Sequence, residues 1–184
     1  MLSRYLLVST NLVCLSRGYV NCVAFKPDNP NIVVSGSYDE TIKTWDITSG
    51  SCLSTLKVDN SVNSITYSPD GSKLAAAHYK TVSIFNMETN EVLCTLRGHT
   101  DPVMSVCFSP CGEKIASGGG CAYGNKDYSI RIWDAKTGEQ IGSPLSVDGK
   151  VTSVCFSSDG KKLTSGSEDS TVRNWDPATR ASLS

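Results

Sequence analysis

Short runs of alternating apolar and polar residues fill this chain, and the same succession of runs occurs four times. Each copy starts with an alternating run such as 103–108, followed by a turn rich in Pro, Asp and Gly and by a run of small residues. A last run ends on an aromatic residue, which is Trp45, Phe85, Trp133 or Trp175. Alternation with a period of two predicts β-strands, and no stretch has a helical period over ten or more residues. The chain is therefore expected to be all-β.

The third copy shows how one unit is built. Residues 103–108, 113–117, 128–134 and 139–145 are predicted to form four strands of an antiparallel meander. Four such units are expected at 14–57, 58–97, 98–145 and 146–184. The last is truncated, and residues 1–13 form an N-terminal strand or the remnant of a preceding unit. Because one small unit cannot bury its own apolar face, successive units are expected to stack.

Composition excludes several classes of function. The 17 basic and 18 acidic residues nearly balance, and no basic run offers a surface for nucleic acid. The apolar run near the N-terminus is too short for a secretory signal, and no stretch is long enough to span a membrane. The eight cysteines contain no C-x-x-C pair, so we expect neither a metal site nor disulfides, no cofactor, and a cytoplasmic location.

Trp-Asp pairs close three copies, at 45–46, 133–134 and 175–176, and Gly98-His99 opens the third. With these motifs the chain resembles WD40 repeats, which form β-propellers. The resemblance implies four four-stranded blades. Because rings in this family usually hold about seven blades, it favours a partial, open propeller over a closed ring of four. An open arc would leave unpaired edges, so edge pairing or self-association is also expected.

The resemblance also implies a buried hydrogen-bond network in each blade. It joins the His of Gly-His, a Ser or Thr of the second strand, an Asp of the next turn and the Trp. The third copy has all four, and the first and fourth have Ser16 and Val147 at the histidine position. The matching residues are His99, Ser117, Asp127 and Trp133, then Ser35, Asp39 and Trp45, then Ser165, Asp169 and Trp175. The second copy has Val58, Ala75, Tyr79 and Phe85 instead. We therefore expect the first and fourth units to be less stable than the third.

A basic residue stands two positions before each tryptophan, on the same face of the strand: Lys43, Arg131 and Arg173. Either the cation packs on the ring, or an exposed strand simply tolerates it.

Catalysis is disfavoured. His99, Ser117 and Asp127 are the residue types of a hydrolase triad, but Ser117 lies within a predicted strand and has no G-x-S-x-G elbow. The third copy also has a longer hairpin at 118–126, which is either a recognition loop or an insertion without a role.

The resemblance places protein contacts on one face, at the start of each first strand and just before each turn Asp. The positions are Tyr19, Asn21, Tyr38, Ser61, Asn63, His78, Pro102, Met104, Tyr123, Lys126, Lys150, Thr152 and Glu168. The sequence thus predicts a non-catalytic scaffold that binds other proteins or peptides. One alternative is a C-terminal sensor array of a longer multidomain signalling protein, and a third is an enzyme.

Overall fold

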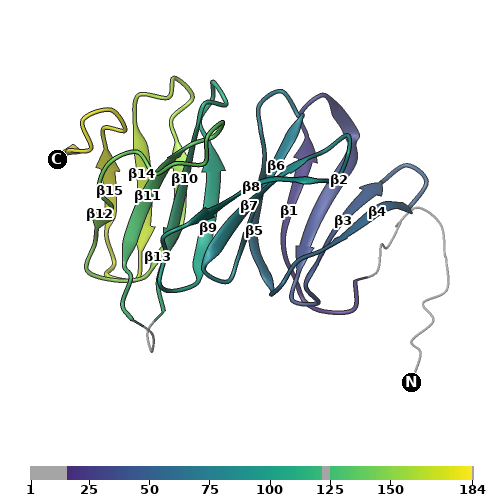
Figure 1. The fold of residues 1–184 in the computed structure, drawn as a ribbon, viewed down its shortest axis with the longest axis horizontal. Helices are drawn as coiled ribbons and strands as arrows, with labels where there is room; N and C mark the ends of the chain where they lie inside the picture. Colours follow the sequence, from purple (N-terminus) through teal and green to yellow (C-terminus); the bar gives the residue numbers. More distant parts are fainter. Residues whose placement is uncertain (1–15, 122–124, 184) are drawn as a thin grey trace.

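The structure is a computed structural model that describes residues 16–121 and 125–183. Within those residues every regular element is a β-strand (Figure 1). The prediction of an all-β chain with four four-stranded units is confirmed. Each sheet is an antiparallel meander in which strands adjacent in sequence are adjacent in space. Each sheet is built from four consecutive strands.

The strands have the following bounds. The first sheet contains β1 (Val20–Lys26), β2 (Asn29–Ser37), β3 (Thr41–Asp46) and β4 (Ser51–Lys57). The second contains β5 (Val62–Tyr67), β6 (Lys73–His78), β7 (Thr81–Asn86) and β8 (Val92–Arg97). The third contains β9 (Val103–Phe108), β10 (Lys114–Gly119), β11 (Ser129–Asp134) and β12 (Leu145–Ser146). The fourth contains β13 (Val151–Phe156), β14 (Leu163–Ser167), β15 (Val172–Trp175) and β16 (Ser182–Leu183).

The turn between the first two strands follows from its sequence. In the third sheet the N–H of Gly112 donates to the carbonyl of Ser109 at 2.8 Å, and the Ser109 hydroxyl accepts from the N–H of Lys114 at 2.9 Å. Gly112 has a φ of 74°, which glycine adopts without strain. The second and fourth sheets make the same turn contacts, from Ser68 and Ser157.

The outer strand of the third sheet differs from the prediction of 139–145. Only Leu145–Ser146 forms a strand, and one isolated bridge joins Trp133 to Gln140. Between these contacts Gly142 has a φ of 67° and Pro144 has no N–H to donate, so the ladder is interrupted.

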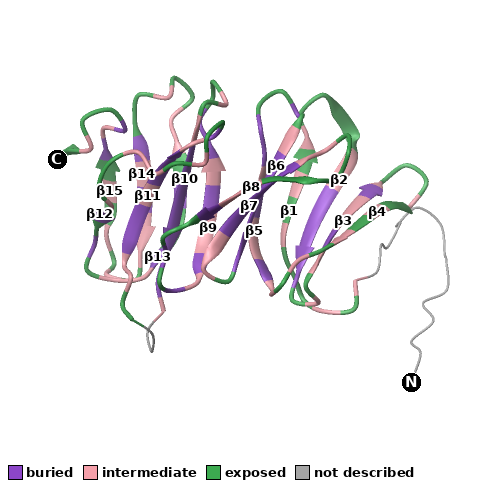
Figure 2. Ribbon diagram, in the orientation of Figure 1, coloured by how far each residue is buried: buried purple, intermediate pink, exposed green. Residues whose placement is uncertain are grey.

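The apolar cores lie between successive sheets. β1 packs beside β5, β5 beside β9, and β9 beside β13. One cluster joins Val34 and Ile42 of the first sheet to Val62 and Leu74 of the second, and similar clusters follow at the next two junctions. Figure 2 shows buried positions concentrated in the middle strands, whereas the outer strand β4 is largely exposed.

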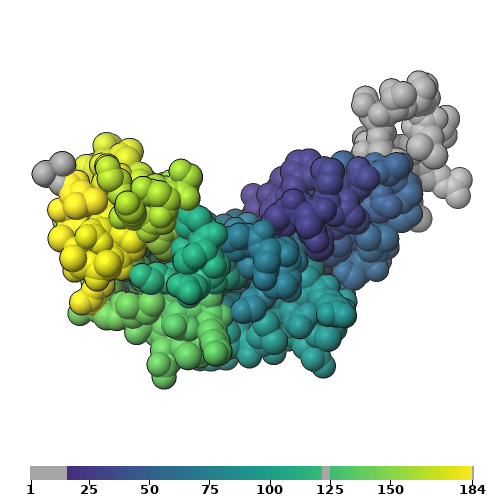
Figure 3. All heavy atoms as spheres, turned by 90° about the horizontal axis from the view of Figure 1, so that it is seen from above, coloured from purple at the N-terminus to yellow at the C-terminus, as the bar shows by residue number. Residues whose placement is uncertain are grey.

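The four sheets follow one another along an open arc, with the first and fourth sheets at its two ends (Figure 3). No closure between those end sheets is found among the described residues. The same part of the chain contains no helix of the length and apolarity that a membrane crossing needs.

Candidate protein-interaction face

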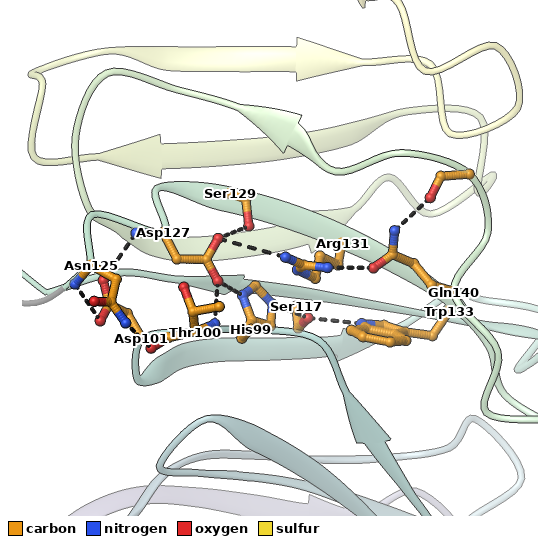
Figure 4. Close-up of polar contacts among 11 residues, drawn as sticks. His99, Thr100, Asp101, Ser117, Asn125, Asp127, Ser129, Arg131, Trp133 and Gln140 are labelled. Atoms are coloured by element: carbon orange, nitrogen blue, oxygen red, sulfur yellow. Dashed lines mark hydrogen bonds and ion pairs between the residues drawn. The ribbon is translucent and has the colours of Figure 1, made fainter.

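A buried network ties the third sheet to the loop that precedes it (Figure 4). Nε2 of His99 lies 2.8 Å from the Ser117 hydroxyl, and Nε1 of Trp133 donates to the same oxygen at 2.8 Å. Nδ1 of His99 lies 3.1 Å from Asp127. His99, Ser117 and Trp133 are all buried. The four residues that the resemblance grouped therefore form one connected set of hydrogen bonds.

The carboxylate of Asp127 fixes the proton on the imidazole. An ionised carboxylate can only accept, so Nδ1 of His99 carries the proton, and Nε2 accepts from the Ser117 hydroxyl when the ring is neutral. Burial alone would raise the pKa of Asp127, but hydrogen bonds from His99, Ser129 and the N–H of Thr100 outweigh it and hold the pKa below its ordinary value.

Asp101 is a member of this region that sequence reasoning missed. Its buried carboxylate accepts the N–H groups of Asn125 and Asp127, both at 2.9 Å. The Asn125 side chain donates to the carbonyl of Thr100 at 3.2 Å. These bonds join the end of the extended hairpin to the loop that carries His99. The only sequence signal was that an acidic residue follows Gly98-His99 closely.

The first and fourth sheets make shorter versions of the network. Trp45 donates to Ser35 at 2.8 Å, and Trp175 donates to Ser165 at 2.9 Å. In the first sheet Ser16, at the histidine position, donates to Asp39 at 2.6 Å. Of the two contacts that His99 makes in the third sheet, this hydroxyl reproduces only the one between Nδ1 and the turn Asp. In the fourth sheet the histidine position is Val147, which is buried, and Asp169 instead accepts from Arg173 at 3.2 Å.

The second sheet contains a different buried polar pair. Phe85 is buried in its apolar core, as its sequence position suggested. The predicted match of Ala75 to the network serine is wrong. Ala76 lies opposite Ser83 as Ser35 lies opposite Lys43, because the hairpin after β6 is one residue shorter than the one after β2. However, Nε2 of His78 lies 2.8 Å from the Ser83 hydroxyl, and both residues are buried. Ser83 is at the position that Lys43, Arg131 and Arg173 occupy in the other sheets. Its small side chain leaves room for the imidazole.

The three basic residues before the tryptophans do not behave alike. Nζ of Lys43 lies 5.5 Å from the centroid of the Trp45 ring. Arg131 donates instead to Gln140 at 2.6 Å, and Arg173 donates to Asp148 at 2.7 Å. Stacking on the ring is therefore seen for Lys43, while the arginines turn toward hydrogen-bond acceptors.

Ser117, His99 and Asp127 are connected in the order of a hydrolase triad, but no substrate can reach them in this arrangement. The Ser117 side chain has no exposed surface, and its oxygen already accepts the Trp133 N–H. A serine nucleophile needs an exposed hydroxyl next to oxyanion donors. The described residues also contain no group of three or more His, Cys, Asp or Glu placed to hold a metal ion.

Above these networks lies the loop face, which we define as the starts of β1, β5, β9 and β13 together with the turns after β2, β6, β10 and β14. An antiparallel meander brings these segments to one end of each sheet. On the loop face of the first sheet, Tyr19 and Tyr38 are 83% and 58% exposed, and their rings meet edge to face at a centroid distance of 6.2 Å.

Tyr79 belongs to the same face, although sequence reasoning considered it only as a substitute in the network. It lies in the short turn between the paired residues His78 and Thr81, which is one residue shorter than the matching turn of the first sheet, and it is 49% exposed. Nζ of Lys80 lies 5.2 Å from its ring centroid. Its φ of 49° is uncommon for an aromatic residue. The signal available in the sequence was an aromatic residue at a predicted turn, next to Lys80.

Other residues expected on this face have internal partners. The side-chain amides of Asn21 and Asn63 donate to the carbonyls of Val62 and Val103 in the next sheet, at 2.8 and 2.9 Å. His78 is buried and therefore presents little surface to a partner. Tyr123 lies outside the described residues.

The remaining positions form a mixed surface. Nζ of Lys150 lies 3.1 Å from a carboxylate oxygen of Glu168, and Lys126 and Thr152 are exposed. Ser61, Pro102 and Met104 are partly exposed. The exposed aromatic side chains of the face thus lie at the first two sheets, while charged side chains lie at the last two and also at Glu40 and Lys80.

Comparison with known proteins places this architecture in a family. The family model described as WD domain, G-beta repeat matches residues 11–46, 50–86, 90–134 and 141–176. Ribosome biogenesis protein ytm1 of Pyrenophora tritici-repentis is 32% identical over 133 residues, covering 68% of this chain and 28% of that protein. Target of rapamycin complex subunit wat1 of Schizosaccharomyces pombe is 32% identical over 117 residues, covering 62% and 35%.

Target of rapamycin complex subunit LST8 of Mus musculus is 27% identical over 155 residues, covering 82% of this chain and 46% of that protein. The chain thus spans less than half the length of each of these curated relatives. The family model matches all four repeats, and each repeat corresponds to strands that the structure shows. The chain belongs to the WD40 repeat family.

Proposed function

We propose that this chain is a non-catalytic scaffold that binds other proteins through its loop face. The main support is the group of exposed aromatic residues Tyr19, Tyr38 and Tyr79 on turns of two neighbouring sheets. Exposed aromatic side chains on a rigid frame supply much of the binding energy of protein interfaces. The turns that carry them are fixed by backbone bonds, such as the 2.9 Å bond from the N–H of Tyr38 to the carbonyl of Tyr19.

The charged end of the same face sets the chemistry of the partner. Lys126, Lys150 and Glu168 bring both signs of charge, so a strongly acidic or basic partner is not favoured. A protein segment with an apolar or aromatic side chain, flanked by polar groups, fits the face best. The printed names of the relatives as complex subunits and as a ribosome biogenesis protein agree with this role. The free state of all described cysteines supports a reducing, intracellular location.

The test compares a variant of the loop face with a matched control. Tyr19→Ala, Tyr38→Ala and Tyr79→Ala are combined in one protein, and Leu53→Ala, Val92→Ala and Leu93→Ala in another. The control residues are 51% to 56% exposed and lie on the outer strands β4 and β8. Each protein is immobilised in cell extract, and retained proteins are quantified by mass spectrometry. Proteins lost only with the tyrosine variant support the proposal, whereas identical sets for both variants, with unchanged melting, refute it.

A second candidate function is a sensor array within a longer protein. It is favoured by the partial coverage of the relatives, which extend well beyond the matched segments. The length of the native transcript on both sides of this reading frame tests it, because additional coding sequence for a different domain is required.

A further inference from the structure

Two of the three junctions between neighbouring sheets are built on the same contact, and the third has alanine in place of glycine. The first residue of an inner strand, Val62 or Val151, packs into a notch left by a glycine of the preceding sheet. A Cβ atom built on Gly36 would lie 2.5 Å from Cγ1 of Val62, and one on Gly118 would lie 2.4 Å from Cγ1 of Val151. At the middle junction Val103 packs in one core with Ala77 of β6, and both are fully buried.

A hydrogen bond to a serine hydroxyl is made at the second and third junctions, whereas Cys22 stands at the serine position of the first. The N–H of Val106 donates to the hydroxyl of Ser64 in the preceding sheet at 3.2 Å, and the N–H of Val154 donates to Ser105 at 3.0 Å. The junction therefore has two complementary halves. A front face offers a notch and a hydroxyl, and a back face offers a β-branched side chain and a backbone N–H.

Among the described residues, no sheet packs on the back face of the first sheet. It consists of Val20, Val23 and Phe25, which are 49%, 64% and 62% exposed. The residues at the same positions in the next two sheets are at most 8% exposed: Val62, Ile65 and Tyr67, then Val103, Val106 and Phe108. The alternating apolar pattern of β1 thus fits it for burial that the described residues do not provide.

The front face of the fourth sheet is open in the same way. It consists of Ser153, Gly166 and Val172. A Cβ atom on Gly166 would meet only Oγ1 of Thr152, at 3.8 Å, so its notch is empty. Val172 is 74% exposed, whereas Ile42, Val82 and Ile130 at the same position are at most 1% exposed. Ser153, at the position of Ser64 and Ser105, is exposed.

We propose that a second copy of this chain docks head to tail on these two faces. Val20 of one copy enters the notch at Gly166 of the other, and the N–H of Val23 donates to the Ser153 hydroxyl. Continuity with the internal junctions carries the choice of occupant, because the junction between the third and fourth sheets already combines a glycine notch at Gly118, the Ser105 hydroxyl and Val151 in this way.

The geometry favours two copies. Figure 3 shows the first and fourth sheets, which carry the back face and the front face, at opposite ends of one arc. In a head-to-tail assembly both faces of every copy are covered only if the assembly closes into a ring. Two copies of four sheets would give a ring of eight sheets, within the range of about four to eight blades for propellers.

One contact differs at the new junction. Internally, prolines of one sheet lie against glycines of the next, as with Pro69 and Gly112 at 3.4 Å. The matching positions at the new junction are Ser158 and Asn29, both exposed. Two polar side chains are suited to the solvated rim of an interface. The apolar contact is left to the three back-face residues.

The test measures the mass of the full chain in solution by light scattering during gel filtration, across a dilution series. The expected mass is twice the 19.7 kDa of the chain. Val23→Asp on the back face would bury a charge, and Gly166→Leu on the front face would fill the notch. Each should raise the dissociation constant of the dimer at least about 30-fold. Val92→Asp, at a residue 54% exposed on β8, is the matched control and should leave the mass unchanged.

Mixing the variants distinguishes head-to-tail docking from other dimers. Val23→Asp leaves its front face intact, and Gly166→Leu leaves its back face intact, so an equimolar mixture should regain dimers through one sound junction. Failure of the mixture to recover, or a dimer insensitive to both variants, would overturn the proposal. So would a monomer at all concentrations. This result is independent of the loop-face test, which uses other residues.

Discussion

Replacing Trp133 by Phe should destabilise the chain more than replacing Phe85 by Leu. Both aromatic residues close the third strand of their sheet, and both are at most 3% exposed. Of these two residues, only Trp133 has a polar side-chain atom, and its Nε1 donates to Ser117 at 2.8 Å. Phenylalanine keeps much of the ring but removes that donor. Ser117, which has no exposed surface, then keeps only its bond to His99.

The expected size of the effect follows from two contributions. Loss of the donor to a buried oxygen costs about 1 kcal/mol, at the low end because Ser117 retains one partner. The phenyl ring is smaller by roughly 40 Å³, which at about 24 cal/mol per Å³ of cavity adds about 1 kcal/mol, with about 1 kcal/mol more for lost apolar burial. Phe85→Leu removes no polar contact and should cost about 1 kcal/mol. The difference between the two variants is therefore about 2 kcal/mol.

Urea unfolding followed by far-ultraviolet circular dichroism measures this difference. With a slope of about 2 kcal/mol per M, the Trp133→Phe midpoint should lie about 1 M below that of Phe85→Leu. Trp45→Phe is a control for water access, because Ser35 and Trp45 line a pocket of about 200 Å³ through which water can replace the lost donor. It should cost about 1 kcal/mol less than Trp133→Phe. Equal midpoints for Trp133→Phe and Phe85→Leu would refute the reasoning.

Three further predictions concern pH and packing. Burial lowers the pKa of His78, so the unfolded chain binds a proton at a higher pH than the folded chain does. The free energy of unfolding should therefore fall as pH drops below about 6.5. His78→Leu should flatten the pH dependence of the melting temperature in that range, and an unchanged slope would exclude His78 as its cause. Hydrogen bonds outweigh burial at Asp127 and keep its folded pKa below the ordinary value, so the stability that it contributes is complete above about pH 4 and is lost below it. Asp127→Asn should therefore reduce the fall of the melting temperature below about pH 4. A parallel shift of the melting temperature at every pH would contradict this. Gly118→Ala should lower the free energy of unfolding by about 1 to 3 kcal/mol, because its Cβ would lie 2.4 Å from Val151. Gly166→Ala should leave the melting temperature of the monomer unchanged, because its Cβ would meet only Thr152. Similar losses of stability for both variants would disprove the role of the notch.

The sequence was sufficient for the architecture because strand signals and turn signals agreed. Alternation predicted the strands, and the Ser-x-x-Gly turns at Ser68, Ser109 and Ser157 supplied their own hydrogen bonds. The outer strand of the third sheet was harder to predict, since its ends look alternating while Gly142 and Pro144 interrupt the ladder. Local propensity does not show how many backbone bonds a short edge strand can make.

The candidate face was less predictable, because position along a repeat does not say which partner a side chain finds. Asn21 and Asn63 occupy loop-face positions, yet their amides bind carbonyls of the next sheet. His78 is buried because Ser83 happens to be small and polar. Such pairings depend on contacts between sheets, and the linear pattern of one repeat contains no record of them.

The extended hairpin of the third sheet shows how an insertion can coexist with the buried network. Six more residues separate Ser117 from Asp127 than separate Ser35 from Asp39, yet Asp127 still reaches His99 at 3.1 Å. Asp101 makes this possible, because it accepts the N–H groups of Asn125 and Asp127 and so returns the chain to the position that the network requires. Asp101→Asn, which keeps the shape but loses the charge and one acceptor, should therefore weaken the Asp127 contact as well. A double-mutant cycle between Asp101→Asn and Asp127→Asn should give a coupling energy of about 0.5 to 3 kcal/mol. Strictly additive losses in that cycle would mean that the hairpin and the network are independent.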